Sequence, residues 1–309
     1  MQTSTVGADI LSHCLLLNAR SLKNKLPDLH FTLDSLKPAC VFICETWLDS
    51  SVSDALIDPS GCYNVYRHDR AHRVGGGVMV LICKTYMSYQ VPIPRQFSGV
   101  EVECCDILGD GTTVRIILVY RPPEFNAVGR EYMVQLIDCL QYLYDDKKTI
   151  LLLGDLNVPY INWENKSSID DHIHSAFLDF CNDHGMDQFV TEPTRNTHIL
   201  DIVLCNDPLI VSSVSVDQPF STADHCSVCF DLVLSAKNKV KHGCNSFDPV
   251  YDFNNYDVQA VNSALLFQPF VFSTPIDSVE EVWKQFIDPV NSIIKSHVPL
   301  KVRLPKRSE

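Results

Sequence analysis

The sequence predicts an α/β fold in which two packed sheets are flanked by helices. Apolar runs of about four to eight residues, rich in Leu, Ile and Val, recur between Gly, Pro and Asp, as expected of buried strands. Longer segments with apolar residues at helical spacing lie between these runs but are fewer. Many strands with fewer helices are typical of a sheet-on-sheet core covered by helices.

Seven runs are the expected strands, and each carries a polar residue at or near one end. In chain order they are HCLLLN ending at 18, ACVFICE ending at 45, GGGVMVLIC from 75, TTVRIILVY ending at 120, TILLLGD ending at 155, HILDIVLCN around 201 and DHCSVCFDLVL from 224. Helices are expected at residues 21–36, 127–143 and 172–184.

The charge changes along the chain near residue 235. Residues 1–234 hold 16 Lys and Arg against 30 Asp and Glu, a formal charge of −14, whereas the rest of the chain is close to neutral. We therefore expect a main domain over residues 10–234, a polar and basic linker over 235–249, and a partly helical C-terminal segment over 250–309. Its helix is expected at residues 277–297, with a kink at Pro289.

Composition restricts the class of protein. The chain is 46% hydrophobic and 20% charged, which is ordinary for a globular protein and too apolar for a disordered one. No apolar run approaches the ~20 residues of a membrane-spanning helix, and the N-terminus lacks the basic start of a secretory signal. Most of the 13 cysteines lie in apolar runs. An intracellular, reducing location, nuclear or cytoplasmic, is therefore expected.

Several polar residues occupy positions where a rigid sheet could hold them together as a site. They follow or open predicted strands: Asn18, Glu45, Tyr120, Asp155, Asn157, Asp224 and His225. Taken singly, each also fits a turn, a cap or half-buried packing. Asp201 is different because it lies inside an apolar strand, where an ionised carboxylate is costly unless it is paired. By residue type, His225 is its expected partner.

These motifs in this order resemble the endonuclease/exonuclease/phosphatase superfamily. Within it, the strings LNARSLKNK, ICETWL, GGGV, VYRPP, GDLNVPYINW, FVTEPTR, LDIVLCNDP and ADH are similar to the apurinic-type endonuclease domain of non-LTR retrotransposons. The resemblance runs over about residues 12–234, and the tail from 249 resembles the connector that precedes reverse transcriptase. It implies a four-layered α/β-sandwich that cleaves phosphate esters with a divalent metal, so residues 10–234 would be the catalytic domain.

The resemblance also implies a metal site. Glu45 would hold Mg²⁺, or Mn²⁺ in its place, as a hard oxygen ligand. Asn18 and Asp224 would complete or orient that shell.

The remaining motif residues receive catalytic roles from the same resemblance. His225, hydrogen-bonded to Asp201, would be cationic and face the phosphate. Asp155 is the candidate general base for the attacking water, with Asn157 positioning that water. Tyr120 would donate to the phosphate or the leaving oxygen.

A DNA substrate conflicts with the acidic charge of residues 1–234, because DNA attraction depends on Lys and Arg. The local exception is a basic cluster just before the three glycines: Arg67, His68, Arg70, His72 and Arg73. We expect this cluster to face DNA, although it could also be a solvated turn.

The function favoured by these observations is a DNA endonuclease of a retrotransposon that leaves a 3′-hydroxyl for a reverse transcriptase encoded elsewhere in the element. Arg20 stands where abasic-site repair enzymes of the superfamily have an acid, which disfavours repair. Ala223 replaces the usual Ser before the final Asp-His pair. Two alternatives stay open: a phosphatase or phosphodiesterase acting on a non-DNA phosphoester, and a catalytically decayed remnant.

Overall fold

A computed structural model describes residues 9–70, 74–109, 112–124, 126–168, 173–234, 250–251, 255–270 and 279–301. The chain divides into two compact units, Met1–Val240 and Lys241–Glu309. The expected linker over 235–249 lies outside the described residues.

Unit 1 contains a first sheet of six strands in the order β13-β14-β1-β2-β4-β3. These strands are β1 (Asp9–Asn18), β2 (Cys40–Cys44), β3 (Tyr63–His68), β4 (Val78–Cys83), β13 (Val211–Pro219) and β14 (Cys226–Leu234). β1 runs parallel to β2 and antiparallel to β14, so the end of β1 lies beside the end of β2 and the beginning of β14.

A second six-stranded sheet has the order β11-β12-β8-β7-β6-β5. Its strands are β5 (Ser88–Gln90), β6 (Glu101–Leu108), β7 (Thr113–Tyr120), β8 (Thr149–Asp155), β11 (Asp187–Gln188) and β12 (Asp201–Cys205). β7 and β8 are parallel, while β12 pairs antiparallel with β8. The ends of β7 and β8 and the beginning of β12 therefore meet at one edge.

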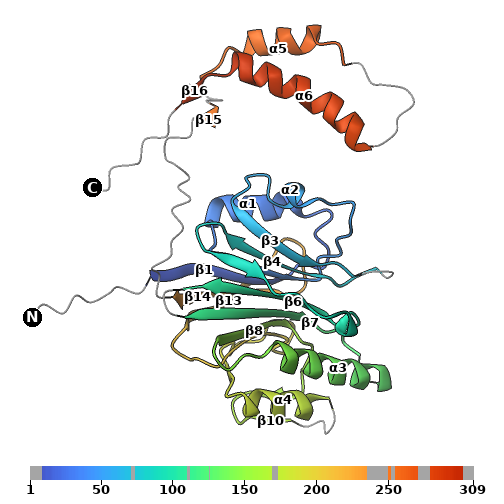
Figure 1. Ribbon diagram of the computed structural model, residues 1–309, viewed down its shortest axis with the longest axis vertical. Coiled ribbons are helices and arrows are strands. Elements are labelled where there is room, and N and C mark those ends of the chain that lie inside the picture. The colour runs from blue at the N-terminus through green and yellow to red at the C-terminus, as the bar shows by residue number, and fades with distance from the viewer. Residues whose placement is uncertain are drawn as a thin grey trace, which may run out of the picture. The chain divides into compact units, whose positions relative to one another are not determined.

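Helices cover the outer faces of both sheets, as Figure 1 shows. On one side lie α1 (Leu26–Leu36) and α2 (Asp54–Ile57), and on the other lie α3 (Ala127–Leu143) and α4 (His174–Asp183). Smaller elements are the 3-10 helix η1 (Arg95–Phe97) and the hairpin of β9 (Ile161–Asn162) and β10 (Ser167–Ser168). The predicted four-layered α/β-sandwich is confirmed.

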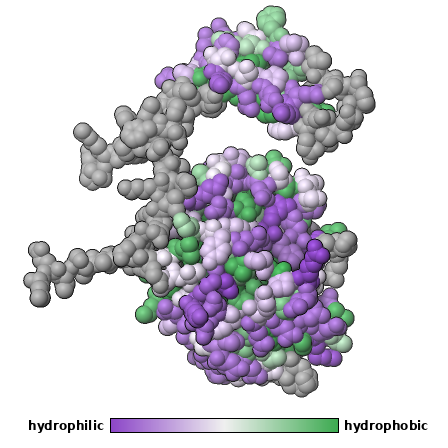
Figure 2. Space-filling view, viewed as in Figure 1, coloured by the Kyte–Doolittle hydropathy of each residue, from purple (hydrophilic) through white to green (hydrophobic). Residues whose placement is uncertain are grey.

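Strand alternation divides the apolar side chains among three cores. In β1, Cys14 and Leu16 point between the sheets, whereas Leu15 and Leu17 pack with Leu29 of α1. A third core joins the second sheet to α3 and α4. The visible face of unit 1 in Figure 2 is largely hydrophilic, as expected when the apolar side chains lie between the layers.

The predicted elements differ from the structure mainly where the chain is polar. All seven expected strands are present, and the helix expected at 127–143 has those bounds. The helix expected from residue 21 begins at Leu26, because residues 19–22 bond to the backbone after β2. The strands β3, β5, β6 and β13 were not predicted. β13 alternates half-buried and exposed residues at the sheet edge, without an apolar run.

Unit 2 is a helical hairpin with a small two-stranded sheet. α5 (Val258–Phe267) packs with α6 (Val279–His297), and β15 (Val250–Tyr251) pairs with β16 (Leu300–Lys301). α6 matches the helix expected at residues 277–297 and continues through Pro289. No helix within the described part of the chain has both the length and the apolar character required to cross a membrane.

Candidate active site

The polar residues predicted from the strand ends lie in two facing rows. In the first sheet, Asn18 ends β1, Glu45 follows β2 and His225 precedes β14. In the second sheet, Tyr120, Asp155 and Asp201 are register partners across three adjacent strands. Since both rows lie at one edge of the sandwich, side chains distant in sequence come together.

Hydrogen bonds and one ion-pair contact connect these two rows into one chain of groups. Asn18 Nδ2 donates to Glu45 Oε1 at 3.0 Å and to Asp155 Oδ2 at 2.8 Å. Asp155 Oδ2 lies 4.0 Å from His225 Nε2, and His225 Nδ1 lies 2.7 Å from Asp201 Oδ2. The expected pairing of Asp201 with His225 is thereby confirmed.

The segment bearing Glu45 is clamped from two sides. Glu45 has a φ of 53°, which is unusual for a residue with a side chain. On one side its carbonyl accepts a bond from Ser21 N at 2.9 Å. On the other, the carbonyls of Gly76 and Gly77 accept from Trp47 N and Thr46 N.

The two glycines of this clamp are required for steric reasons. Both have positive φ, 68° for Gly76 and 82° for Gly77. A Cβ at Gly76 would collide with the side chains of Glu101 and Arg70. The absence of side chains at these glycines therefore allows their backbone to approach the Glu45 segment closely.

The carboxylate of Glu45 is oriented by a donor on each oxygen. Asn18 Nδ2 bonds to Oε1, and the indole nitrogen of Trp47 donates to Oε2 at 3.0 Å. A carboxylate oxygen has two lone pairs, so each retains one for a further partner. Trp47 was not singled out from the sequence, where it is only one letter of ETWL.

Burial makes the charges of this group strongly interdependent. Asp155, Asp201 and His225 are each at most 2% exposed. Burial alone lowers the pKa of His225, but the hydrogen bond with Asp201 and the charges of Asp201 and Asp155 outweigh it and raise the pKa to about 9. Burial and the charge of Asp201 raise the pKa of Asp155. The imidazole is therefore cationic at neutral pH, and Asp155 is a stronger base than an ordinary carboxylate.

Tyr120 ends its strand beneath the guanidinium of Arg70, which lies 5.6 Å from the ring centroid. Burial and the charges of Glu45 and Asp155 raise the pKa of the Tyr120 hydroxyl. The hydroxyl therefore remains a donor at neutral pH.

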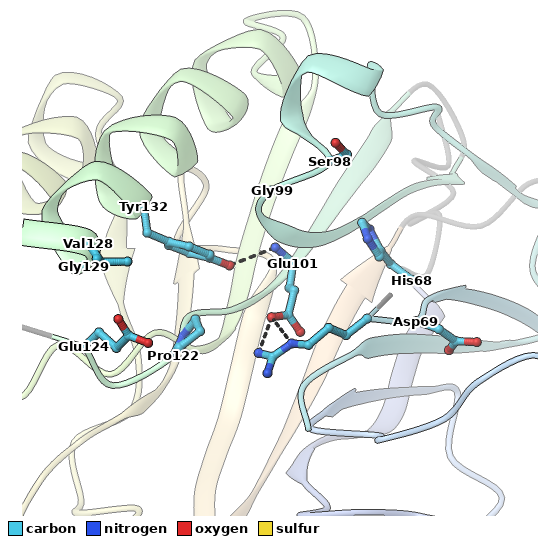
Figure 3. A pocket seen from close by; sticks show the side chains of 11 residues that line it. His68, Asp69, Ser98, Gly99, Glu101, Pro122, Glu124, Val128, Gly129 and Tyr132 are labelled. Atoms are coloured by element: carbon cyan, nitrogen blue, oxygen red, sulfur yellow. Dashed lines mark hydrogen bonds and ion pairs between the residues drawn. The ribbon is translucent and has the colours of Figure 1, made fainter. Parts of the chain in front are cut away.

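A cavity of about 500 Å³ lies beside Tyr120, and Figure 3 shows its lining. Tyr132 donates to the Tyr120 carbonyl at 3.0 Å and accepts from Glu101 N at 2.9 Å. Glu101 also accepts from Arg70 Nε at 2.8 Å. Sequence reasoning missed Glu101 because β6 mixes acidic and apolar residues.

Asn157 is buried two residues beyond Asp155, in a left-handed conformation with a φ of 47°. Its Nδ2 donates to the Arg121 carbonyl at 2.7 Å, and Arg121 Nη1 donates to the Asn157 carbonyl at 2.9 Å. Its backbone nitrogen lies 3.3 Å from Asp155 Oδ1. Arg121, which the sequence offered only as part of VYRPP, thus fixes this turn.

Asp224 lies apart from the hydrogen-bonded chain of groups. Its Oδ2 accepts from Arg195 Nη2 at 2.6 Å and lies 3.1 Å from Arg20 Nη1. Its expected part in holding the metal remains a prediction.

The basic cluster expected to face DNA has its described arginines turned inward. The side chains of Arg67 and Arg70 are 14% and 13% exposed. Arg67 pairs with Asp69 and Asp54, and Arg70 pairs with Glu101. His72 and Arg73 lie outside the described residues. DNA contact by this cluster stays a prediction.

The donor set suits a hard divalent cation. Glu45 offers free lone pairs beside Asn18 and Asp155, and Asp201 Oδ1 is buried without a hydrogen-bond partner among the described residues. Asp155, Asp201 and His225 offer ligand atoms within 4.8 Å of one another. Oxygen-rich sets of this kind are those that Mg²⁺ and Mn²⁺ prefer.

One family model matches part of the chain. Residues 114–229 match a family model described as endonuclease-reverse transcriptase. This region includes Tyr120, Asp155, Asp201 and His225 but not Asn18 or Glu45. No curated protein matches the chain.

Solved structures match the fold over nearly their full length. They include a 3′ phosphatase from Neisseria bound to a product DNA hairpin, with 15% identity, a TM-score of 0.56 and coverage of 72% of this chain and 99% of that chain. The endonuclease domain of TRAS1, a telomere-specific non-LTR retrotransposon, has 15% identity and a TM-score of 0.55, and the match covers 72% of this chain and 98% of that chain. An AP endonuclease from Archaeoglobus fulgidus has 14% identity and a TM-score of 0.54, and the match covers 71% of this chain and 98% of that chain.

The family match and the shared fold confirm the resemblance to the endonuclease/exonuclease/phosphatase superfamily. At these identities, the structural matches establish the fold only.

Proposed function

We propose that this chain is a metal-dependent endonuclease that hydrolyses phosphodiester bonds of DNA and leaves a 3′-hydroxyl. The observation that carries this proposal is the buried chain of groups from Glu45 through Asn18, Asp155 and His225 to Asp201. This arrangement supports the proposal, because a cationic imidazole, a carboxylate with a raised pKa and further oxygen ligands meet at one edge of a rigid sandwich, and phosphodiester hydrolysis requires such groups.

Each residue has a task set by its surroundings. His225, held by Asp201, donates through Nε2 to a phosphate oxygen and offsets its charge. Asp155 accepts the proton of the attacking water, because its raised pKa strengthens it as a base. Asn157 orients that water, and the Tyr120 hydroxyl donates to the phosphate or the leaving oxygen.

Glu45 and Asn18 are the proposed holders of Mg²⁺ or Mn²⁺. The carboxylate of Asp224, predicted from the sequence as a third holder, is paired with Arg20 and Arg195. The cation would offset negative charge that builds on the phosphate in the transition state. Asn18 bonds to both Glu45 and Asp155, so the metal holder and the base are kept in fixed relation.

DNA is the proposed substrate, and a reverse transcriptase is the proposed user of the new 3′-hydroxyl. The relatives named above support DNA, since they include a protein bound to a DNA hairpin and a retrotransposon endonuclease. The description of the matched family supports the reverse transcriptase.

A nicking assay tests the proposal. The purified full chain is incubated with supercoiled plasmid in Mg²⁺, Mn²⁺ or EDTA, and nicked products are offered directly to a polymerase. We expect metal-dependent relaxed circles whose 3′ ends are extended without prior phosphatase treatment. A panel of inositol phosphates and p-nitrophenyl phosphate is the comparison. Hydrolysis of the panel without nicking would show that the substrate is a small phosphoester and not DNA. Inactivity on all substrates would overturn the enzyme proposal.

A further inference from the structure

Two arginines pair with one carboxylate beside the active site, and Lys25 and Asp28 lie near them. Asp224 pairs with Arg20 and Arg195, at the distances given above. Lys25 bonds to the Ala19 carbonyl at 2.7 Å, and its pKa is lowered by burial and then by the charge of Arg20. Arg20, Arg195 and Lys25 against Asp224 and Asp28 leave one net positive charge here, in contrast to the charge of −14 carried by residues 1–234.

The loop that carries Arg20 is held in an unfavourable backbone conformation. Arg20 and Ser21 have φ values of 42° and 80°, although neither is glycine. Bonds from Ser21 N to the Glu45 carbonyl and from Leu22 N to the Thr46 carbonyl, both 2.9 Å, hold the loop there. Strain of this kind persists where surrounding contacts impose it and is concentrated at functional sites. Arg20 is thus fixed relative to Glu45.

A cavity of about 510 Å³ lies beside Arg20 and Lys25 and reaches Trp47. Its lining includes Arg20, Lys25, Ser221, Thr222 and Trp47 together with the carboxylate of Asp28, which accepts from Ser221 Oγ at 2.6 Å. Arg195 is not part of the lining but shares Asp224 with Arg20. Because the indole nitrogen of Trp47 bonds to Glu45, this wall of the cavity adjoins the proposed metal holder. An anion in the cavity would therefore lie next to the reacting phosphate.

We propose that Arg20 and Arg195, held together by Asp224, bind a DNA backbone phosphate next to the one that is cleaved. This subsite rests on the proposed function, because it takes DNA as the ligand. Two guanidinium groups sharing one carboxylate retain a net positive charge and have donors to spare for phosphate oxygens. The subsite gives an acidic domain a local means of holding DNA.

The salt dependence of DNA binding tests this subsite without requiring catalysis. Binding of the full chain to a labelled duplex is measured by anisotropy in EDTA at several salt concentrations. Each phosphate contact contributes about 0.9 to the slope of log K against log salt. Because the two arginines contact one phosphate, we expect the double variant Arg20→Gln/Arg195→Gln to lower this slope by about 0.9 and Arg20→Lys/Arg195→Lys to restore it.

A matched control removes two charges elsewhere. Lys37 and Lys84 are exposed and lie at the opposite end of the first sheet, next to the beginning of β2 and the end of β4. Lys37→Gln/Lys84→Gln should leave the slope unchanged. An unchanged slope in the Arg20/Arg195 glutamine variant, with its thermal unfolding intact, would overturn the subsite.

The outcomes separate this subsite from the proposed function. A native chain that binds DNA through these arginines but never nicks supports the subsite and removes the endonuclease proposal. If the native chain nicks DNA and the Arg20/Arg195 glutamine variant keeps the full salt dependence of binding, only the subsite proposal is contradicted.

Discussion

Two groups of charged side chains lie at the same end of the sandwich but differ in how completely they are paired. The guanidinium of Arg67 donates to Asp69 and Asp54 and to the carbonyls of Val52 and Asp49. The second group, here called the Asp155 group, consists of Asp155, Asp201 and His225: two carboxylates on neighbouring strands and one imidazole. Asp201 Oδ1 there has no hydrogen-bond partner among the described residues.

This difference separates a structural network from a reactive one. A saturated network stabilises the fold and leaves nothing for a ligand. An incompletely paired, buried group keeps capacity for a substrate or an ion, and its pKa values are shifted. The Arg67 network is of the first kind and the Asp155 group is of the second.

The largest expected effect is on catalysis, when the base is removed. Asp155→Asn keeps the shape and an acceptor oxygen but removes a group able to take a proton from water. We expect the nicking rate to fall by about 10³-fold. Asp187→Asn is the control, because Asp187 is half-exposed and lies at the far end of β12. A loss of less than tenfold in Asp155→Asn would remove Asp155 as the base.

A buried carboxylate outside both groups, Glu103, shows what burying an acidic group costs the fold. Glu103 accepts from Gln90 at 2.9 Å, and burial raises its pKa to about 7. The folded chain thus holds a proton that the unfolded chain releases near its ordinary pKa. Stability should fall as the pH rises from about 4.5 to about 7.

Replacing this carboxylate should remove that pH dependence. At pH 8, Glu103→Gln should be more stable than the native chain by about 3 kcal/mol, with little difference at pH 4. Denaturant unfolding at both pH values measures this. Equal stabilities at pH 8 would show that Glu103 is not held in a costly environment.

Substitution of Arg67 tests whether this side chain stabilises the fold or contacts DNA. Arg67→Gln leaves the partly buried Asp69 without its cation, so unfolding should become easier by about 2 kcal/mol. We expect the salt dependence of DNA binding to stay the same, because the charge is already compensated. A slope lowered by about 0.9 with unchanged stability would instead place Arg67 on DNA.

The smallest expected effect concerns Asp224. Its carboxylate is engaged by two arginines, so Asp224→Asn should change the Mg²⁺ concentration for half-maximal nicking by no more than about twofold. Loss of a group that helps to hold a metal typically weakens binding by about 10-fold or more. A metal titration of nicking therefore decides whether Asp224 belongs to the metal site.

The sequence predicted the strand-end residues well, because apolar runs determine both the strands and their ends. Asn18 and Asp155 lie where the predicted strands end, whereas Asp201, predicted inside a strand, is the first residue of β12. The cost of burying Asp201 still indicated its histidine partner. The strands with mixed polarity, such as β6 and β13, gave no comparable signal.

Tertiary partners could not be predicted in the same way. Arg70 and Glu101 meet only because the second sheet brings β6 against the glycine loop. The predicted helix includes residues 21–25, but in the structure the segment before α1 bonds to the backbone of residues 45 and 46 instead. These bonds depend on the parallel pairing of β1 with β2, which local spacing does not reveal. Such contacts follow from the assembled sheets, whereas local spacing reports only each element.

The most direct test of the central claim is a double-mutant cycle on plasmid nicking by the full chain. If Asp201 acts only by holding His225 in one common site, Asp201→Asn/His225→Ala should be no slower than His225→Ala alone. Circular dichroism confirms that each variant is folded. If the two single losses multiply in the double variant, or if His225→Ala nicks at the native rate, the buried chain of groups is not the catalytic unit.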